Sequence, residues 1–127
     1  MNKTTLYRPV GQKEMDLIET SEMKAFPPRL EWQPIFYPVL NIEYACQIAQ
    51  RWNTEDEFSG YVSYVLSFNI PTEYYEKFEV QNVGGFEHNE LWVPAEELDE
   101  FNKKIIDKIK LEKTFYGDKY KNSILPS

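Results

Sequence analysis

The sequence predicts a single α+β domain with a mixed or mostly antiparallel sheet that is split into two halves and accompanied by short helices. The chain has 127 residues, about the length of one domain. Hydrophobic residues make up 42% of it, which is enough to form a core. The second half contains several strand-like segments with short connections, and this favours antiparallel pairing over a doubly wound parallel sheet.

The first third of the chain predicts a strand, a helix and an ordered loop. Residues 4–10 are β-branched and aromatic and end at a proline and a glycine, which is typical of an edge or terminal strand. Met15 and Ile18 lie at helical spacing and indicate a short helix over residues 12–19. Two consecutive prolines in residues 26–30 remove backbone donors and predict an ordered loop.

The middle of the chain contains the clearest helix and the clearest strand. Residues 34–39 form a compact apolar run that predicts a short strand. Asn41 is a suitable N-cap for a helix over residues 42–52. Its apolar positions predict one buried face: Tyr44, Ala45, Ile48, Ala49 and Trp52. Residues 61–70 are the longest strand signal and indicate a central strand.

Shorter elements follow the predicted central strand. Residues 71–75 begin with a proline and fit a short helix. Residues 78–83 form a further strand candidate, which a pair of glycines ends. Residues 87–93 then resume extended structure. These short segments and connections are what favour antiparallel pairing.

The chain ends with a second amphipathic helix and a last strand. The helix begins at Pro94 and carries Leu98 and Phe101 on its apolar side. Residues 105–115 alternate in polarity and predict a strand. We therefore expect the domain to span residues 1–115 and a polar tail to span residues 116–127.

Composition disfavours several classes of protein. With 14 basic and 21 acidic residues the net charge is −7, so the surface as a whole repels nucleic-acid backbones and anionic lipids, although a local cationic pocket remains compatible with it. One cysteine, Cys46, and one histidine provide no metal-binding set, so we expect no metal. Neither a signal peptide nor a run of about 18 apolar residues is found, and we expect a cytoplasmic protein without membrane contact.

Glu90 and His88 are the first candidates for chemistry. They are two residues apart in an extended segment, so their side chains point to the same face. A carboxylate inside a cleft can stabilise a sugar oxocarbenium ion, and an imidazole titrates near neutral pH. Alternatively, both residues occupy the solvated face of an antiparallel strand.

Arg8, Tyr37 and Phe36 are candidates for ligand binding. The guanidinium of Arg8, at the end of the first strand, could clamp a phosphate or a ribose, or it could simply be solvated. The aromatic rings of Tyr37 and Phe36 could sandwich a flat ring such as nicotinamide, or they could pack in the core.

Three segments, in their order along the chain, resemble the ADP-ribosyltransferase fold: Leu6-Tyr7-Arg8, Ile35-Phe36-Tyr37 and Asn89-Glu90-Leu91-Trp92-Val93. The last is similar to the Asn-Glu-Tyr-Ile-Val around the catalytic Glu of poly-ADP-ribose polymerases. The chain from Leu6 to about Phe115 also resembles a family of small bacterial proteins labelled "ADP-ribosylation/crystallin J1". That likeness is carried by residues 7–11, 26–30, 34–40 and 90–98.

The resemblance implies an enzyme that uses NAD as its substrate and transfers ADP-ribose to an acceptor that the sequence does not identify. It implies that Arg8 holds the phosphate or ribose of NAD, that Tyr37 or Phe36 stacks on nicotinamide, and that Glu90 bonds the nicotinamide ribose and stabilises the oxocarbenium ion. It places His88 two residues before that Glu, where many transferases have a residue that helps to choose the acceptor.

Two other functions remain open at this point. The same fold could serve as a binding module without catalysis, which recognises a nucleotide, an ADP-ribosylated group or a protein. A third hypothesis is a partner protein that uses an apolar patch around Trp92 and Phe101.

Overall fold

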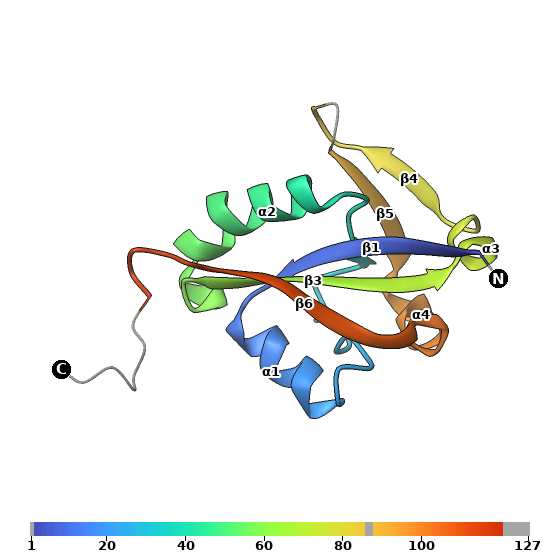
Figure 1. The fold of residues 1–127 in the computed structure, drawn as a ribbon, viewed down its shortest axis with the longest axis horizontal. Helices are drawn as coiled ribbons and strands as arrows, with labels where there is room; N and C mark the ends of the chain where they lie inside the picture. Colours follow the sequence, from blue (N-terminus) through green and yellow to red (C-terminus); the bar gives the residue numbers. More distant parts are fainter. Residues whose placement is uncertain (1, 86–87, 121–127) are drawn as a thin grey trace.

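Two three-stranded antiparallel sheets form the framework of the protein in a computed structural model that describes residues 2–85 and 88–120 (Figure 1). The first sheet has the order β1 (Lys3–Val10), β3 (Val62–Pro71), β6 (Ile106–Tyr116). The second has the order β2 (Ile35–Phe36), β5 (Asn89–Pro94), β4 (Glu79–Asn82). The predicted α+β class, with antiparallel strands divided into two halves, is confirmed.

Strand β3 is the central strand of the first sheet, as predicted. It pairs with β1 on one side, where Leu6 lies opposite Phe68, and with β6 on the other. Its side chains alternate between two faces, so Val65 and Leu66 enter separate hydrophobic clusters. Both faces of the sheet must therefore be covered.

Helices α1 (Gln12–Thr20) and α2 (Ile42–Arg51) lie on opposite sides of this sheet (Figure 1). Met15 and Ile18 of α1 are buried in the larger cluster, as their spacing predicted. Tyr44, Ala45 and Ala49 of α2 are buried in the smaller cluster. The Asn41 side chain accepts a hydrogen bond from the Tyr44 backbone N at 2.7 Å, so the predicted N-cap is confirmed.

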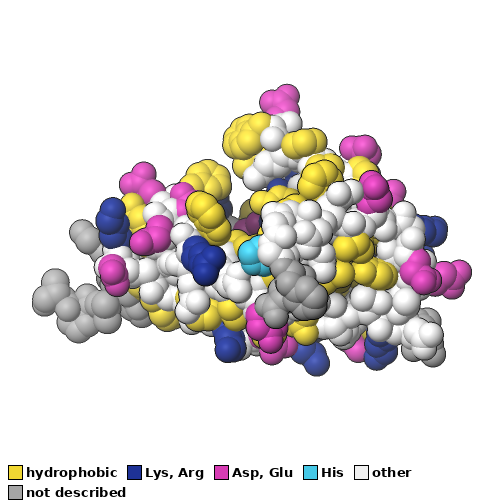
Figure 2. All heavy atoms as spheres, turned by 90° about the horizontal axis from the view of Figure 1, so that it is seen from above, with side chains coloured by type: hydrophobic (Ala, Val, Ile, Leu, Met, Phe, Trp, Pro, Cys, Tyr) yellow, Lys and Arg dark blue, Asp and Glu magenta, His cyan; other side chains and the backbone are white. Residues whose placement is uncertain are grey.

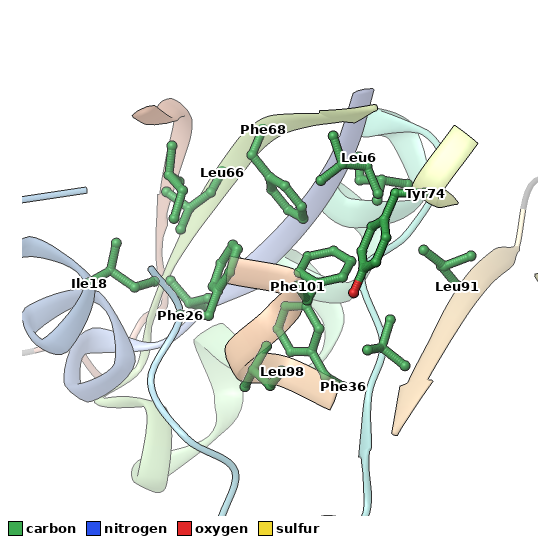
Figure 3. Close-up of a cluster of buried hydrophobic side chains, with 14 of the residues drawn as sticks. Leu6, Ile18, Phe26, Phe36, Leu66, Phe68, Tyr74, Leu91, Leu98 and Phe101 are labelled. Carbon is green, nitrogen blue, oxygen red and sulfur yellow. The ribbon is translucent and has the colours of Figure 1, made fainter. Parts of the chain in front are cut away.

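The larger cluster joins the two sheets (Figure 3). Phe36 comes from β2 and Phe68 from β3, while Phe26 comes from the loop between α1 and β2. Phe101 comes from α4 (Leu98–Lys104), and its ring centroid lies 5.4 Å from that of Phe36 and 5.9 Å from that of Phe68. Aromatic rings from four segments thus form one shared core.

Short elements complete the fold. Helix α3 (Thr72–Tyr75) follows β3 directly, and Pro71 is its N-cap. Three single-turn 3₁₀ helices are also present: η1 (Asn53–Glu55), η2 (Glu57–Ser59) and η3 (Ala95–Glu97). No helix in the described part of the chain has the length and apolar character needed to cross a bilayer.

Two sequence predictions about exposure were wrong. Trp52, the C-cap of α2, is 68% exposed although its N–H still donates to the Ile48 O at 2.9 Å, so the buried face of the helix ends before its last turn does. Phe101 cannot contribute to an exposed apolar patch because the shared core buries it completely. At the carboxyl end, β6 continues to Tyr116, and the rest of the predicted tail from residue 121 lies outside the described residues.

Candidate functional site

The candidate site lies where the two sheets meet. Val39 is paired with Tyr7 of β1 on one side and with Glu90 of β5 on the other. The Tyr7 N donates to the Val39 O at 2.9 Å, and the Val39 N donates to the Tyr7 O at 2.8 Å. Because directly paired residues point to the same face, Tyr7, Val39 and Glu90 all face α2. Val39 is therefore the single residue that lies between β1, the strand of Arg8, and β5, the strand of Glu90.

Two side chains hold the carboxylate of Glu90, which is only 9% exposed. The Tyr44 hydroxyl donates to Glu90 Oε2 at 2.6 Å, and the Trp92 Nε1 donates to Glu90 Oε1 at 3.0 Å. Burial raises the pKa of the Tyr44 phenol, and the bond to Glu90 and its charge raise it further. The phenol thus remains a protonated donor, and the carboxylate is fixed by two bonds of the strong, charge-assisted kind.

His88 reaches Glu90 only through Tyr44. The rings of His88 and Tyr44 are stacked with centroids 4.4 Å apart and an interplanar angle of 17°. The Gly85 N donates to His88 Nδ1 at 3.2 Å, and His88 Nε2 lies 2.8 Å from Gln47 Oε1. Since Nδ1 accepts, Nε2 carries the proton and donates to Gln47, and this assignment gives a neutral imidazole. Both ring nitrogens are therefore engaged, and the ring supports Tyr44.

Arg8 is buried and paired, which contradicts the interpretation of a solvated strand-end arginine. It is 7% exposed, and its Nε and Nη2 donate to the two carboxylate oxygens of Glu14 at 2.7 Å and 3.0 Å. Burial alone would lower the pKa of Arg8, but the charge and hydrogen bonds of Glu14 raise it. Glu14 lies in the first turn of α1, so this two-pronged pair joins β1 to the start of that helix.

The two aromatic candidates occupy different environments. Phe36 is completely buried in the shared core, whereas the Tyr37 ring is exposed. The Arg8 Cζ lies 4.9 Å from the Phe36 ring centroid and 5.7 Å from that of Tyr37. Tyr37 is therefore the ring that a ligand can reach, and Phe36 supports the arginine from behind.

A cavity of about 240 Å³ opens beside Arg8 and Tyr37. The residues that matter for its chemistry are Arg8, Lys13, Glu14, Arg29, Tyr37 and Val39. Glu90 does not line this cavity, but its strand neighbour Val39 does. The Tyr37 phenol also contributes to the raised pKa of both Arg8 and Tyr44. Seen from the α2 side, the surface is hollowed beside the single histidine (Figure 2), which does not itself line the 240 Å³ cavity.

The structure thus places the five predicted site residues in two groups, and Val39, which lines the cavity and is paired with Glu90, connects them. Arg8 and Tyr37 line the cavity, with Phe36 behind them. Glu90 and His88 meet around Tyr44. No group of three or more His, Cys, Asp or Glu side chains in the described residues is arranged to hold a metal ion.

Sequence reasoning missed four members of the site: Glu14, Arg29, Tyr44 and Trp92. A signal was available for two of them. Trp92 is two residues from Glu90 on the same strand and must share its face. Tyr44 is on the buried face of its helix, and a buried phenol needs a polar partner. Nothing local indicated that Glu14 pairs with Arg8 or that Arg29 reaches the cavity.

Comparisons of the chain with protein-family models, with curated proteins and with solved structures found no match. The function of the site must therefore be argued from its own chemistry.

Proposed function

We propose that the protein is an ADP-ribosyltransferase-like enzyme that binds NAD, breaks the bond between nicotinamide and ribose, and transfers ADP-ribose to an acceptor. One observation carries the proposal: Glu90, a buried carboxylate fixed by two donors, lies at the junction of two antiparallel sheets and is paired with Val39, which lines a cavity with a buried arginine and an accessible tyrosine.

The proposed reaction needs a fixed negative charge. The carbon–nitrogen bond to nicotinamide breaks, its electron pair leaves with nicotinamide, and positive charge develops on the ribose ring. The carboxylate of Glu90 would stabilise this oxocarbenium ion without reorienting, because Tyr44 and Trp92 already hold it. The acceptor then bonds to the same ribose carbon and releases a proton.

The cavity would hold part of the dinucleotide. The exposed ring of Tyr37 can pack against the flat nicotinamide, and the guanidinium of Arg8 adds positive charge for a phosphate. The volume of the cavity, about 240 Å³, is below the range of about 300–1,000 Å³ that is typical of small-molecule sites. The nicotinamide ribose, which joins these two groups in NAD, would therefore lie at the Val39 side of the cavity, the side that leads to Glu90, and the adenosine half would extend outside the cavity.

A binding module without turnover is the second candidate, and one feature favours it. Each oxygen of Glu90 already accepts a hydrogen bond, and Arg8 already has Glu14 as its partner. Because Glu90 and Arg8 are already bound to other protein groups, the site can bind a nucleotide and still lack a free group that would act on it.

Calorimetric titration with NAD, followed by measurement of free nicotinamide in the same sample, tests the proposal. The protein is expected to bind NAD and release nicotinamide. Glu90→Gln keeps the side chain's shape but removes its charge, and it is expected to slow release by about 10²–10³, by analogy with the loss of one oxyanion-hole donor. Binding without release would favour the module, and unchanged release by Glu90→Gln would exclude the role given to Glu90.

Glu97→Gln is the matched control. Glu97 also accepts a hydrogen bond from a buried phenol, since the Tyr74 hydroxyl lies 2.8 Å from its Oε2, but it lies outside the cavity. This variant loses a comparable tyrosine–glutamate pair and is expected to release nicotinamide at the rate of the unmodified protein.

A further inference from the structure

Arg29 has a half-buried guanidinium without a carboxylate partner. Its Nε donates to the Ile35 backbone O at 3.2 Å, and among the described residues no Asp or Glu oxygen lies within 4.0 Å of its nitrogens. Burial lowers the pKa of Arg29, the positive charge of Arg8 lowers it further, and the charges of Glu14 and Tyr37 offset this only in part. The contrast with Arg8, which Glu14 binds with two hydrogen bonds, shows that only one of the two charges is neutralised.

The two arginines face the same space. Both line the 240 Å³ cavity, and both guanidinium groups lie over the same two rings. The Arg29 Cζ lies 6.0 Å from the Phe36 centroid and 5.9 Å from the Tyr37 centroid. The charge of Arg8 acts unfavourably on that of Arg29, and Glu14 binds only Arg8, so the pair of arginines keeps one positive charge without a bound carboxylate.

The carboxylates of the cavity lining balance only two of its three positive side chains. Among the described residues Glu14 and Asp56 line the cavity, and Glu14 is bound to Arg8. The two oxygens of Asp56 accept hydrogen bonds from the Phe58 N at 3.2 Å and from the Ser59 hydroxyl at 3.0 Å. Lys13 adds a third cation to the lining.

The start of α1 adds further positive potential. Gly11, its N-cap, lines the cavity and supplies no capping side chain. A Cβ at position 11 would lie 2.7 Å from Ser59, so a capping side chain would collide there. The positive end of the helix dipole therefore has no capping side chain at Gly11 and adds positive potential on this side of the cavity.

The loop that carries Arg29 is held before any ligand arrives. At its start, the Asn102 side chain exchanges two hydrogen bonds of 2.9 Å with the backbone of Phe26. Near its end, the Gln33 side chain accepts from the Leu30 N at 3.0 Å. Two prolines between these anchors stiffen the backbone. Binding an anion would therefore cost little ordering of this segment.

We propose that the cavity is a site for a phosphate-type oxyanion and that Arg29 supplies its principal contact, while Arg8 is held back by Glu14 and adds charge. This anion site rests on the proposed enzyme function in one respect only, which is that the pyrophosphate of NAD is named as its natural ligand. The fork of Arg29 suits a phosphate because only its Nε donates to a described residue, which leaves the two Nη atoms to donate parallel bonds as far as the described part of the chain shows.

Titration with inorganic pyrophosphate and, separately, with ADP-ribose tests the site without any turnover. Both are expected to bind, and Arg29→Gln is expected to weaken them about ten- to a hundredfold, the loss of a charge-assisted contact. Arg29→Lys keeps the charge but loses the fork, and intermediate binding is expected. Arg51→Gln is the matched control, since it removes an exposed arginine that does not line the cavity and should leave both affinities unchanged.

The outcomes separate this proposal from the proposed enzyme. If pyrophosphate and ADP-ribose do not bind, or if Arg29→Gln binds them as tightly as the unmodified protein, the anion site is wrong even where NAD is cleaved. If Arg29→Gln and Arg51→Gln reduce the affinity for these anions equally, the anions are attracted by the overall charge of the protein, and the anion site is also wrong. If the site behaves as expected and nicotinamide is never released, the anion site stands and the enzyme does not. Circular dichroism of each variant shows that it is folded.

Discussion

At the scale of single residues, two buried tyrosine–glutamate pairs have the clearest effect on how stability depends on pH. Tyr44 donates to Glu90 at the candidate site, and Tyr74 donates to Glu97 beside the shared core. Both phenols are buried, and burial followed by the bonded carboxylate raises the pKa of each. The folded protein thus holds two protons that the unfolded chain would release in mild alkali.

Stability is therefore expected to fall in alkali. Because the folded pKa lies above the unfolded value of 10.0, each phenol's contribution is complete below pH 10 and is lost as the pH rises above it. Tyr44→Phe and Tyr74→Phe should each reduce the alkaline slope of the unfolding free energy by about 1.4 kcal/mol per pH unit. Urea unfolding between neutral pH and pH 11 measures the slopes, and identical slopes in all variants would contradict the assignment. A slope should remain in the double variant, since burial also raises the pKa of Tyr64 and Tyr75.

At the scale of the element, the first turn of α2 links helix capping to the site. Asn41 has extended backbone geometry, and its side chain accepts from the Tyr44 N at 2.7 Å. The residue that receives the cap is the same one whose hydroxyl holds Glu90 and whose ring stacks on His88. The start of the helix therefore sets the position of the carboxylate's main donor.

Asn41→Ala is expected to destabilise the protein by about 1 kcal/mol, within the range of about 0.5–2 kcal/mol for lost N-caps. Asn41→Ser retains a capping oxygen and should recover most of this loss. Urea unfolding measures both. The chain has one histidine, so its single imidazole NMR signal reports the stack on Tyr44. That signal should shift in Asn41→Ala and stay in place in Asn41→Ser. An unshifted signal in Asn41→Ala would show that the N-cap does not control the position of Tyr44 at the site.

At the scale of the whole molecule, one aromatic core joins both sheets. Phe36 belongs to the second sheet and Phe68 to the first, and Phe101 contacts both. Unfolding of either sheet would remove part of the core on which the other sheet packs. We therefore expect the two sheets to unfold together.

Phe101→Ala is expected to cost about 3–5 kcal/mol, as is usual for a large buried ring. Tryptophan fluorescence, which includes Trp92 of β5, and far-ultraviolet circular dichroism should show one coincident transition in the unmodified protein and in the variant. Leu17→Ala, an exposed change on α1, should shift the transition by no more than about 0.5 kcal/mol. Two separated transitions would show that the sheets unfold independently.

Local pattern was sufficient for most of the fold. The strand at residues 61–70 and the helix beginning at Ile42 were expected nearly where β3 and α2 lie, because alternation and helical spacing record which side chains a packed face buries. Trp52 shows the limit of this reasoning. Its spacing continued the apolar face, but it stands at the C-cap of the helix and is 68% exposed.

The sequence by itself determined the α+β class, the order of the elements, the cap at Asn41 and the strand that carries Glu90. Only the tertiary structure decided the chemistry of those residues. Glu90 is held by a tyrosine 46 positions away, Arg8 is occupied by Glu14, and Arg29 is left without a carboxylate beside it. The physical reason is that periodicity depends on the nearest few residues, whereas the partner of a buried polar group depends on which distant segments pack against it.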